Sequence, residues 1–193
     1  MSELDQNKTV GEIAEHYKAI LQLLGEDINR EGLIRTPMRA AKALWYATQG
    51  YREDADAVMR QAIFHHDGSQ MVIVKGIEFY SLCEHHILPF FGHVSIGYVP
   101  DGEILGLSKL ARIVNVFARR LQVQERMTSE IMESIRTTLH PKGVIVYCEA
   151  GHLCMKMRGV EKQDSVTATS AYCGVFENDP QLRAEFLSAI KQY

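Results

Sequence analysis

The sequence has 193 residues, of which 46% are hydrophobic and 23% charged, a composition typical of a globular protein with one sizeable core. The formal net charge is −3, so the chain lacks the basic excess of proteins that coat nucleic acid. No apolar run approaches the roughly 20 residues that span a bilayer. We therefore expect a cytoplasmic protein that binds neither nucleic acid nor a membrane and keeps its four cysteines reduced.

Apolar periodicity predicts helices in the first third of the chain. They are expected over 9–24, from Thr36 to about Gln49, and over about 54–64. Thr9 and Glu12 form a capping-box pattern at the start of the first helix, and Thr36-Pro37 is typical of a helix start. The turn-rich segment HHDGSQ at 65–70 ends this pattern, so we expect an N-terminal helical region over residues 1–65.

The remaining residues, 66–193, alternate between strand and helix patterns. Strands are expected at 71–75, 77–83, 91–98, 144–149, 152–158 and 165–175, and helices from Ser108, over 125–139 and after Asp179-Pro180. The strands come in groups separated by a pair of helices, which favours antiparallel pairing. The predicted class is therefore α+β, not a parallel doubly wound sheet.

Two short motifs contain metal-binding residue types: Cys83-Glu84-His85-His86 and His152-Leu153-Cys154. In a strand over 152–158, His152, Cys154 and Arg158 would share one face, because residues two apart point the same way. Zn²⁺ accepts thiolate and imidazole ligands, and a catalytic site keeps one position open for water, whereas a structural site would use four protein ligands. Spacing alone leaves open which of Cys83, His85, His86, His152 and Cys154 bind the metal. Histidines that do not bind it are candidates for proton transfer.

A candidate anion site lies where Gly106-Leu107-Ser108-Lys109 leads into a helix, since free backbone amides and the helix dipole attract anions. Arg112 follows one turn later. The pattern fits equally well a Ser108 that only caps the helix and a Lys109 that is only solvated. Glu125, in the polar loop 122–126, could accept two N–H bonds from a guanine edge, although exposed glutamates are more often just solvated. Arg39 would need the fold, or a neighbouring subunit, to reach such a site.

Five strings, TPMRAAKAL, SLCEHHILPFFG, GLSKLARIV, RLQVQERMT and GHLCMKMRGV, resemble GTP cyclohydrolase I in order and spacing, from about residue 9 to the last helix. The resemblance implies the zinc ligands Cys83, His86 and Cys154, with His85 and His152 off the metal as proton donors and acceptors. It implies that Glu125, helped by Gln124, holds the guanine. The residues implied to meet the triphosphate are Ser108, Lys109, Arg112, Arg158 and Arg39, the last from another subunit.

The resemblance also implies the tunnelling fold, an antiparallel sheet with a helix pair behind it. The implied assembly is a homodecamer of two face-to-face pentamers, with active sites at subunit interfaces. The implied reaction uses a zinc cofactor to convert GTP and water to formate and 7,8-dihydroneopterin triphosphate, the first step of folate and pterin biosynthesis. Two alternatives remain. Nitrile reductases of queuosine synthesis share this fold but use a cysteine nucleophile and a nicotinamide cofactor, and a zinc- or pterin-binding module would have no activity.

Overall fold

The computed structural model describes residues 3–158 and 162–191, which form two compact units. The first unit ends at Gln49 and the second begins at Gly50. Residues 50–65 therefore group with the second unit, whereas the sequence places the domain boundary at residue 65, and that domain boundary stays a prediction. No helix among the described residues is long and apolar enough to cross a membrane.

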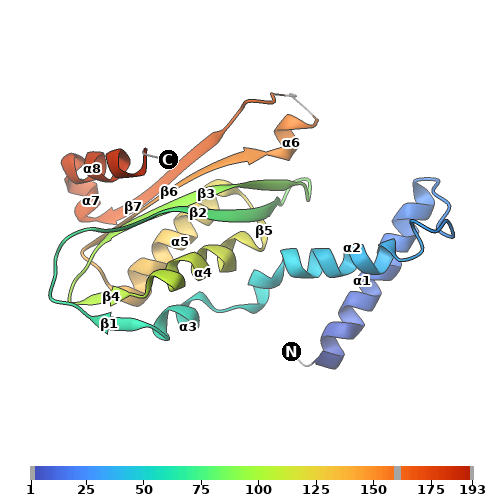
Figure 1. Ribbon diagram of the computed structural model, residues 1–193, viewed down its shortest axis with the longest axis horizontal. Coiled ribbons are helices and arrows are strands. Elements are labelled where there is room, and N and C mark those ends of the chain that lie inside the picture. The colour runs from blue at the N-terminus through green and yellow to red at the C-terminus, as the bar shows by residue number, and fades with distance from the viewer. Residues whose placement is uncertain (1–2, 159–161, 192–193) are drawn as a thin grey trace. The chain divides into compact units, whose positions relative to one another are not determined.

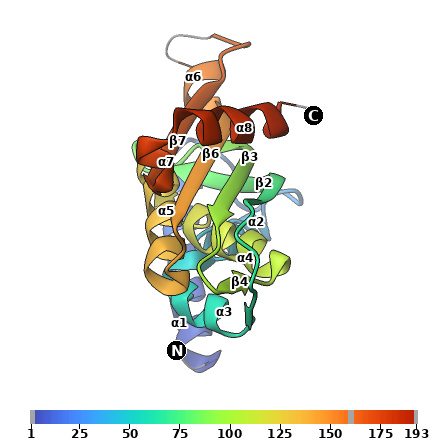
Figure 2. The ribbon, with the colours of Figure 1, turned by 90° about the vertical axis from the view of Figure 1, so that its left-hand side faces the viewer.

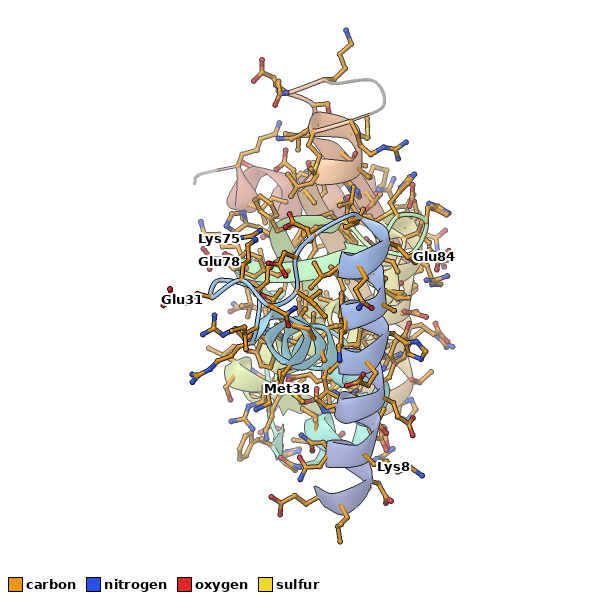
Figure 3. All side chains as sticks on the ribbon, turned by 90° about the vertical axis from the view of Figure 1, so that its right-hand side faces the viewer. Lys8, Glu31, Met38, Lys75, Glu78 and Glu84 are labelled. Carbon is orange, nitrogen blue, oxygen red and sulfur yellow. The ribbon has the colours of Figure 1, made fainter. Side chains whose placement is uncertain are left out.

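The first unit is a pair of helices, α1 (Glu3–Leu23) and α2 (Thr36–Ala47). They pack through a small apolar cluster around Val10, Ala14 and Ala41. Lys8 and Glu31 of this unit point into solvent (Figure 3). The cluster is small because only one stripe of each helix is buried.

The helix starts follow the predicted signals in part. α2 begins at Thr36, as expected. The capping box predicted at Thr9 is wrong, because α1 already starts at Glu3, and the Thr9 hydroxyl donates to the carbonyl of Asp5 inside the helix. At the last helix, the carboxylate of Asp179 accepts the first free backbone N–H groups and so caps it.

The second unit contains strands with helices on both sides (Figure 1). Its helices are η1 (Gln49–Arg52), which begins at the junction of the units, α3 (Ala55–Arg60), α4 (Leu107–Ala118), α5 (Gln124–Leu139), α6 (Leu153–Lys156), α7 (Val175–Asn178) and α8 (Pro180–Ile190). Its strands are β1 (Ile63–His65), β2 (Val72–Cys83), β3 (Pro89–Val99), β4 (Glu103–Leu105), β5 (Leu121–Gln122), β6 (Gly143–His152) and β7 (Thr167–Gly174). The sequence does not predict β1, β4, β5, α6 or α7, since two to four residues are too few to form a periodic pattern.

Five strands form the main sheet in the order β5-β2-β3-β6-β7, and every neighbouring pair is antiparallel except β2 with β5. β2 is one strand where the sequence predicts two, because a bulge between Val74 and Ile77 shifts the register without ending the pairing with β3. Gly76 lies in this bulge with φ of 69°, a conformation that glycine adopts without strain.

The helices α4 and α5 cover one face of the sheet and form the main core against it (Figure 1). Alternate side chains of β3, among them Phe90, Val94 and Ile96, are fully buried in this core. On the opposite face, α7 and α8 cover one end of the sheet around Phe176 and Phe186 (Figure 2). The α+β class is confirmed, and a helix pair behind an antiparallel sheet is the arrangement that the tunnelling fold implies.

The predicted strand over 152–158 is wrong. β6 ends at His152, and the next four residues form the single helical turn α6. β6 ends at His152 for two reasons. Its neighbour β3 begins at Pro89, which has no N–H to extend the ladder, and on its other side the pairing with β7 stops at Ala150. His152, Cys154 and Arg158 therefore do not share a strand face.

A glycine in β3 permits the close approach of β6. A Cβ added at Gly92 would overlap the carbonyl oxygen of Glu149, which is backbone and cannot move aside cheaply. We expect Gly92→Ala to lower the free energy of unfolding by about 2–3 kcal/mol, measured by denaturant titration. Gly11→Ala is the control, because nothing lies within 4 Å of the added Cβ. An equal effect of both substitutions would contradict the steric cause.

Candidate metal centre

The turn between β2 and β3 contains two of the candidate metal ligands. The N–H of Cys83 donates to the carbonyl of Leu88, and the N–H of Ile87 donates to the carbonyl of Cys83, each over 2.8 Å. Ile87 adopts a left-handed backbone conformation, with φ of 55°, which lets the chain reverse within a few residues. The reversal brings the Sγ of Cys83 to 3.8 Å from the Nδ1 of His86.

The third member of the group is Cys154, on α6. One ligand atom each of Cys83, His86 and Cys154 lies within 4.8 Å of the other two. Ligand atoms of a tetrahedral zinc ion, at about 2.0–2.3 Å from the metal, stand roughly 3.3–3.8 Å apart. Two thiols and one imidazole therefore fit zinc in donor type, and a small inward movement would fit it in spacing. Three protein ligands also leave a fourth position free for water.

Of the two thiols in this group, that of Cys83 is buried and that of Cys154 is half-buried. Burial first, and then the neighbouring Cys83 thiol, raises the pKa of the Cys154 thiol, while the guanidinium of Arg158 opposes the rise. Arg158 therefore acts electrostatically on the cluster although it is not on a shared strand face. A divalent cation between the two thiols would reverse the shift, since a thiol that coordinates a metal is deprotonated.

One of the two remaining motif histidines, His152, is held firmly beside the cluster. Its ring stacks on Phe90, with the ring centroids 4.6 Å apart and the planes inclined by 4°. Its Nε2 lies 2.8 Å from the Oε1 of Gln124. Burial lowers the pKa of His152, and the carboxylate of Glu125 partly opposes this shift. Phe90 thus orients the ring from its face, and Gln124 orients it from one edge.

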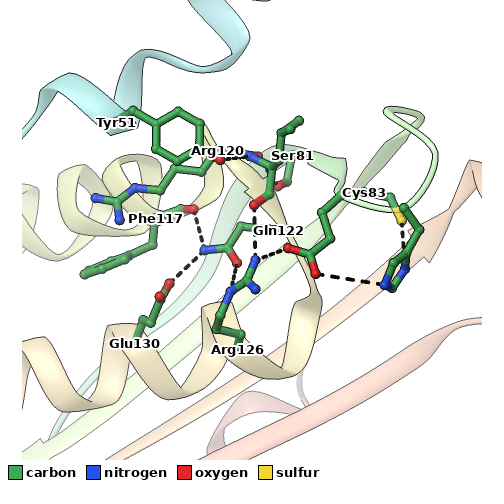
Figure 4. A network of polar contacts seen from close by, with 11 residues as sticks. Tyr51, Ser81, Cys83, Phe117, Arg120, Gln122, Arg126 and Glu130 are labelled. Carbon is green, nitrogen blue, oxygen red and sulfur yellow. Dashed lines mark hydrogen bonds and ion pairs between the residues drawn. The ribbon is translucent and has the colours of Figure 1, made fainter.

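The other motif histidine, His85, is more exposed and less constrained. Its Nδ1 lies 3.9 Å from the Sγ of Cys83, and its Nε2 lies 3.9 Å from an oxygen of Glu84. The other oxygen of Glu84 accepts from Arg126 over 2.5 Å, and this contact lowers the pKa of the Glu84 carboxyl. Arg126 in turn donates to Gln122 over 3.0 Å, so a polar network links the turn to the start of α5 (Figure 4).

Sequence reasoning missed this network, which joins residues 42 positions apart. The acidic residue inside the CEHH motif and the arginine inside QVQER are the signals that could have suggested it. The network supports the turn that presents Cys83 and His86, because the backbone N–H of Glu84 also donates to the carbonyl of Gln122.

The structure separates the predicted anion site from the metal cluster. Ser108 and Lys109 lie in the first turn of α4, beside β4, whereas the last turn of α4 leads to β5, which pairs with β2 at Cys83 (Figure 1). A helix of 12 residues spans about 18 Å, so this helix holds the two groups apart. Gly106, not Ser108, occupies the N-cap position.

The charged residues predicted around the substrate differ in their surroundings. Lys109 is buried, and its Nζ donates to the Oε1 of Gln61 over 2.7 Å, so it is not merely solvated. Ser108 and Arg112 are exposed on α4, and Glu125 is exposed in the first turn of α5. Arg39 is exposed on α2, in the first unit.

The family model that matches this chain and the curated relatives similar to it carry the same family name. A family model described as GTP cyclohydrolase I matches residues 13–191. GTP cyclohydrolase 1 of Porphyromonas gingivalis is 55% identical over 190 residues, which cover 98% of each chain. GTP cyclohydrolase 1 of Parabacteroides distasonis is 56% identical over 180 residues, 93% of this chain and 91% of that one. GTP cyclohydrolase 1 of Dictyostelium discoideum is 50% identical over 188 residues, 97% of this chain and 81% of that one.

Proposed function

The chain belongs to the GTP cyclohydrolase I family, and we propose that it converts GTP and water to formate and 7,8-dihydroneopterin triphosphate with a zinc ion held by Cys83, His86 and Cys154. The observation that carries the proposal is the convergence of these three side chains from two separate motifs. When bound, zinc supplies a water that is activated at neutral pH for attack on the purine.

The donor set supports a catalytic rather than a structural zinc. Two cysteines and one histidine make three ligands, one short of the four that a structural site uses. Two further histidines, His85 and His152, lie close to the cluster without belonging to it. Such an arrangement suits a hydrolase, because the chain keeps titratable groups beside the metal for proton transfer.

We assign separate proton transfers to the two histidines. His152 is the fixed one, and we propose that it delivers a proton to N7 of guanine, which makes C8 more electrophilic. His85 is exposed beside Glu84, and we propose that it exchanges protons during ring opening and loss of formate. Positioned general acids and bases typically contribute about 10²–10⁴-fold to a rate.

The charged residues suit a purine nucleoside triphosphate. Glu125 offers an exposed carboxylate at the start of α5, and we propose that it pairs with N1–H and the exocyclic amine of guanine. Arg158 lies near Cys154 and would meet the phosphates from the same chain. Ser108, Lys109 and Arg112 lie on α4, away from the cluster, so we propose that they and Arg39 reach the triphosphate of a neighbouring subunit.

That division of residues supports a symmetric assembly. A site built from one end of α4 in one subunit and the metal cluster of the next requires a second copy of the chain. We propose a homodecamer of two pentamers, working in the cytoplasm, where the four cysteines stay reduced, without disulfide bonds, as they are in the structure.

The direct test is incubation of the zinc-loaded protein with GTP, without NADPH, while the absorbance of a reduced pterin is followed. We expect product to form, and removal of zinc by a chelator to lower the rate at least about 10³-fold, because without the metal the pKa of the attacking water lies far above neutral pH. Added zinc should restore the rate. Turnover that required NADPH would favour a reductase, and no turnover of GTP would favour a binding module.

A further inference from the structure

We propose that Gln124 is a positioning residue for His152 and does not contact the guanine, in contrast to the role that the family resemblance implies. The side chain of Gln124 is 1% exposed, so it lies in the interior although it stands at the start of α5. The role deepens the proposed function, on which it rests, because it concerns the group that we assign to protonate the purine.

The surroundings of Gln124 fix the direction of its amide. Its Nε2 donates to the carbonyl of Cys148 over 3.1 Å and to the carbonyl of Thr167 over 3.0 Å. Thr169 Oγ1 is a third partner at 3.1 Å. Because the two carbonyls can only accept, the nitrogen of the amide must face them and the oxygen must face His152.

The direction of the amide in turn fixes which nitrogen of His152 faces it as the donor. Oε1 of Gln124 can only accept, so Nε2 of His152 is the donor of their 2.8 Å bond. The other ring nitrogen, Nδ1, is not used by this bond. Phe90 holds the plane of the ring by stacking on it. The bond and the stack together therefore set the orientation of the ring and leave Nδ1 as the nitrogen that can face the purine.

A guanine contact by Gln124 would disrupt this arrangement. Every polar atom of its side chain is already bonded within the chain, and a buried donor or acceptor that loses its partner is costly. Its neighbour Glu125 is exposed, because successive residues of a helix point about 100° apart. Glu125 is therefore exposed and able to bind the guanine, whereas Gln124 is buried against His152.

Two substitutions separate this role from the alternatives. Gln124→Met removes the acceptor for His152, whereas Gln124→Glu, kept protonated by burial against the two carbonyls, retains an acceptor oxygen for His152 and one O–H donor. We expect Gln124→Met to lower kcat for GTP about 10²-fold with bound zinc unchanged and KM altered less than about threefold. Gln124→Glu should keep at least about a tenth of kcat.

The same measurements define the results that overturn the proposal. A KM increase of about tenfold or more with kcat unchanged would mean that Gln124 binds the guanine. Equal losses of kcat in both variants would mean that Gln124 only supports the fold. In a His152→Ala background, Gln124→Met should cause no further loss, because it acts through that ring, and an additional loss contradicts the proposal.

Failure of the proposed function is distinguishable, since the zinc-loaded wild type would then not turn over GTP at all. Crystal structures in that event give an independent readout. The His152 ring should leave its stack on Phe90 in Gln124→Met and stay in place in Gln124→Glu. An unmoved ring in Gln124→Met would refute the positioning role.

Discussion

Replacement of Cys154 by alanine is expected to remove bound zinc and to lower kcat/KM for GTP at least about 10³-fold. The group has three protein ligands, so the loss of one leaves a cysteine and a histidine, too few to hold the ion at the affinity of a zinc enzyme. Metal content by elemental analysis and turnover by pterin absorbance would both be measured, because the two losses should occur together.

Cys173→Ala is the matched control for that substitution. Cys173 lies on β7 opposite Val144, near the end of β6 that is remote from His152. Its removal should leave zinc content and turnover close to those of the wild type. Retention of stoichiometric zinc by Cys154→Ala would contradict the ligand assignment, and a loss of zinc from both variants would point to general destabilisation.

Glu125→Ala is expected to abolish most GTP turnover while zinc stays bound. A carboxylate that accepts N–H bonds from the guanine edge discriminates strongly, because a partner group left unpaired in the complex costs about 2–5 kcal/mol, or roughly 30- to 5,000-fold. Since Glu125 is exposed in the free protein, its replacement should not alter stability by more than about 0.5 kcal/mol. Steady-state kinetics and metal content on the same preparation would check both statements.

Glu133→Ala provides the control on the same helix. Glu133 is an exposed carboxylate paired with Arg136, and it lies two turns further along α5. Its removal should leave kcat/KM unchanged. If Glu125→Ala also keeps its rate, the guanine is anchored by other groups, and if it loses zinc, its carboxylate supports the metal centre instead.

The residue types of the metal centre could be predicted from sequence, but their local structure could not. Cys83, His86 and Cys154 come together although Cys154 is on a helical turn and not on the predicted strand. Leu153, Met155 and Met157 give the alternation of a strand, yet β3 begins only at Pro89 and β7 only opposite Ala150, so the strand partners that such a pattern needs are missing. The available strand partners, and not the periodicity of the sequence, therefore determine that residues 153–156 form a helical turn.

Contacts between distant segments are the features of the site that could not be predicted from the sequence. The bond between Gln124 and His152 and the ion pair between Arg126 and Glu84 join α5 to two separate motifs. Each pair joins a polar side chain of one motif to a polar side chain of another. Composition and spacing within a motif do not show such contacts. Ser108 and Lys109 show the converse case, since they belong to the same family pattern as the metal ligands but stand at the far end of α4.

Titration of the metal-free protein with zinc, with formate release from GTP as the readout, tests the central claim most directly. Activity should be absent at the start, rise in proportion to added zinc and stop rising at one ion per chain, the capacity of a single Cys83–His86–Cys154 group. Full formate release before any zinc is added, or a plateau that requires several ions per chain, would contradict a reaction that depends on this one site.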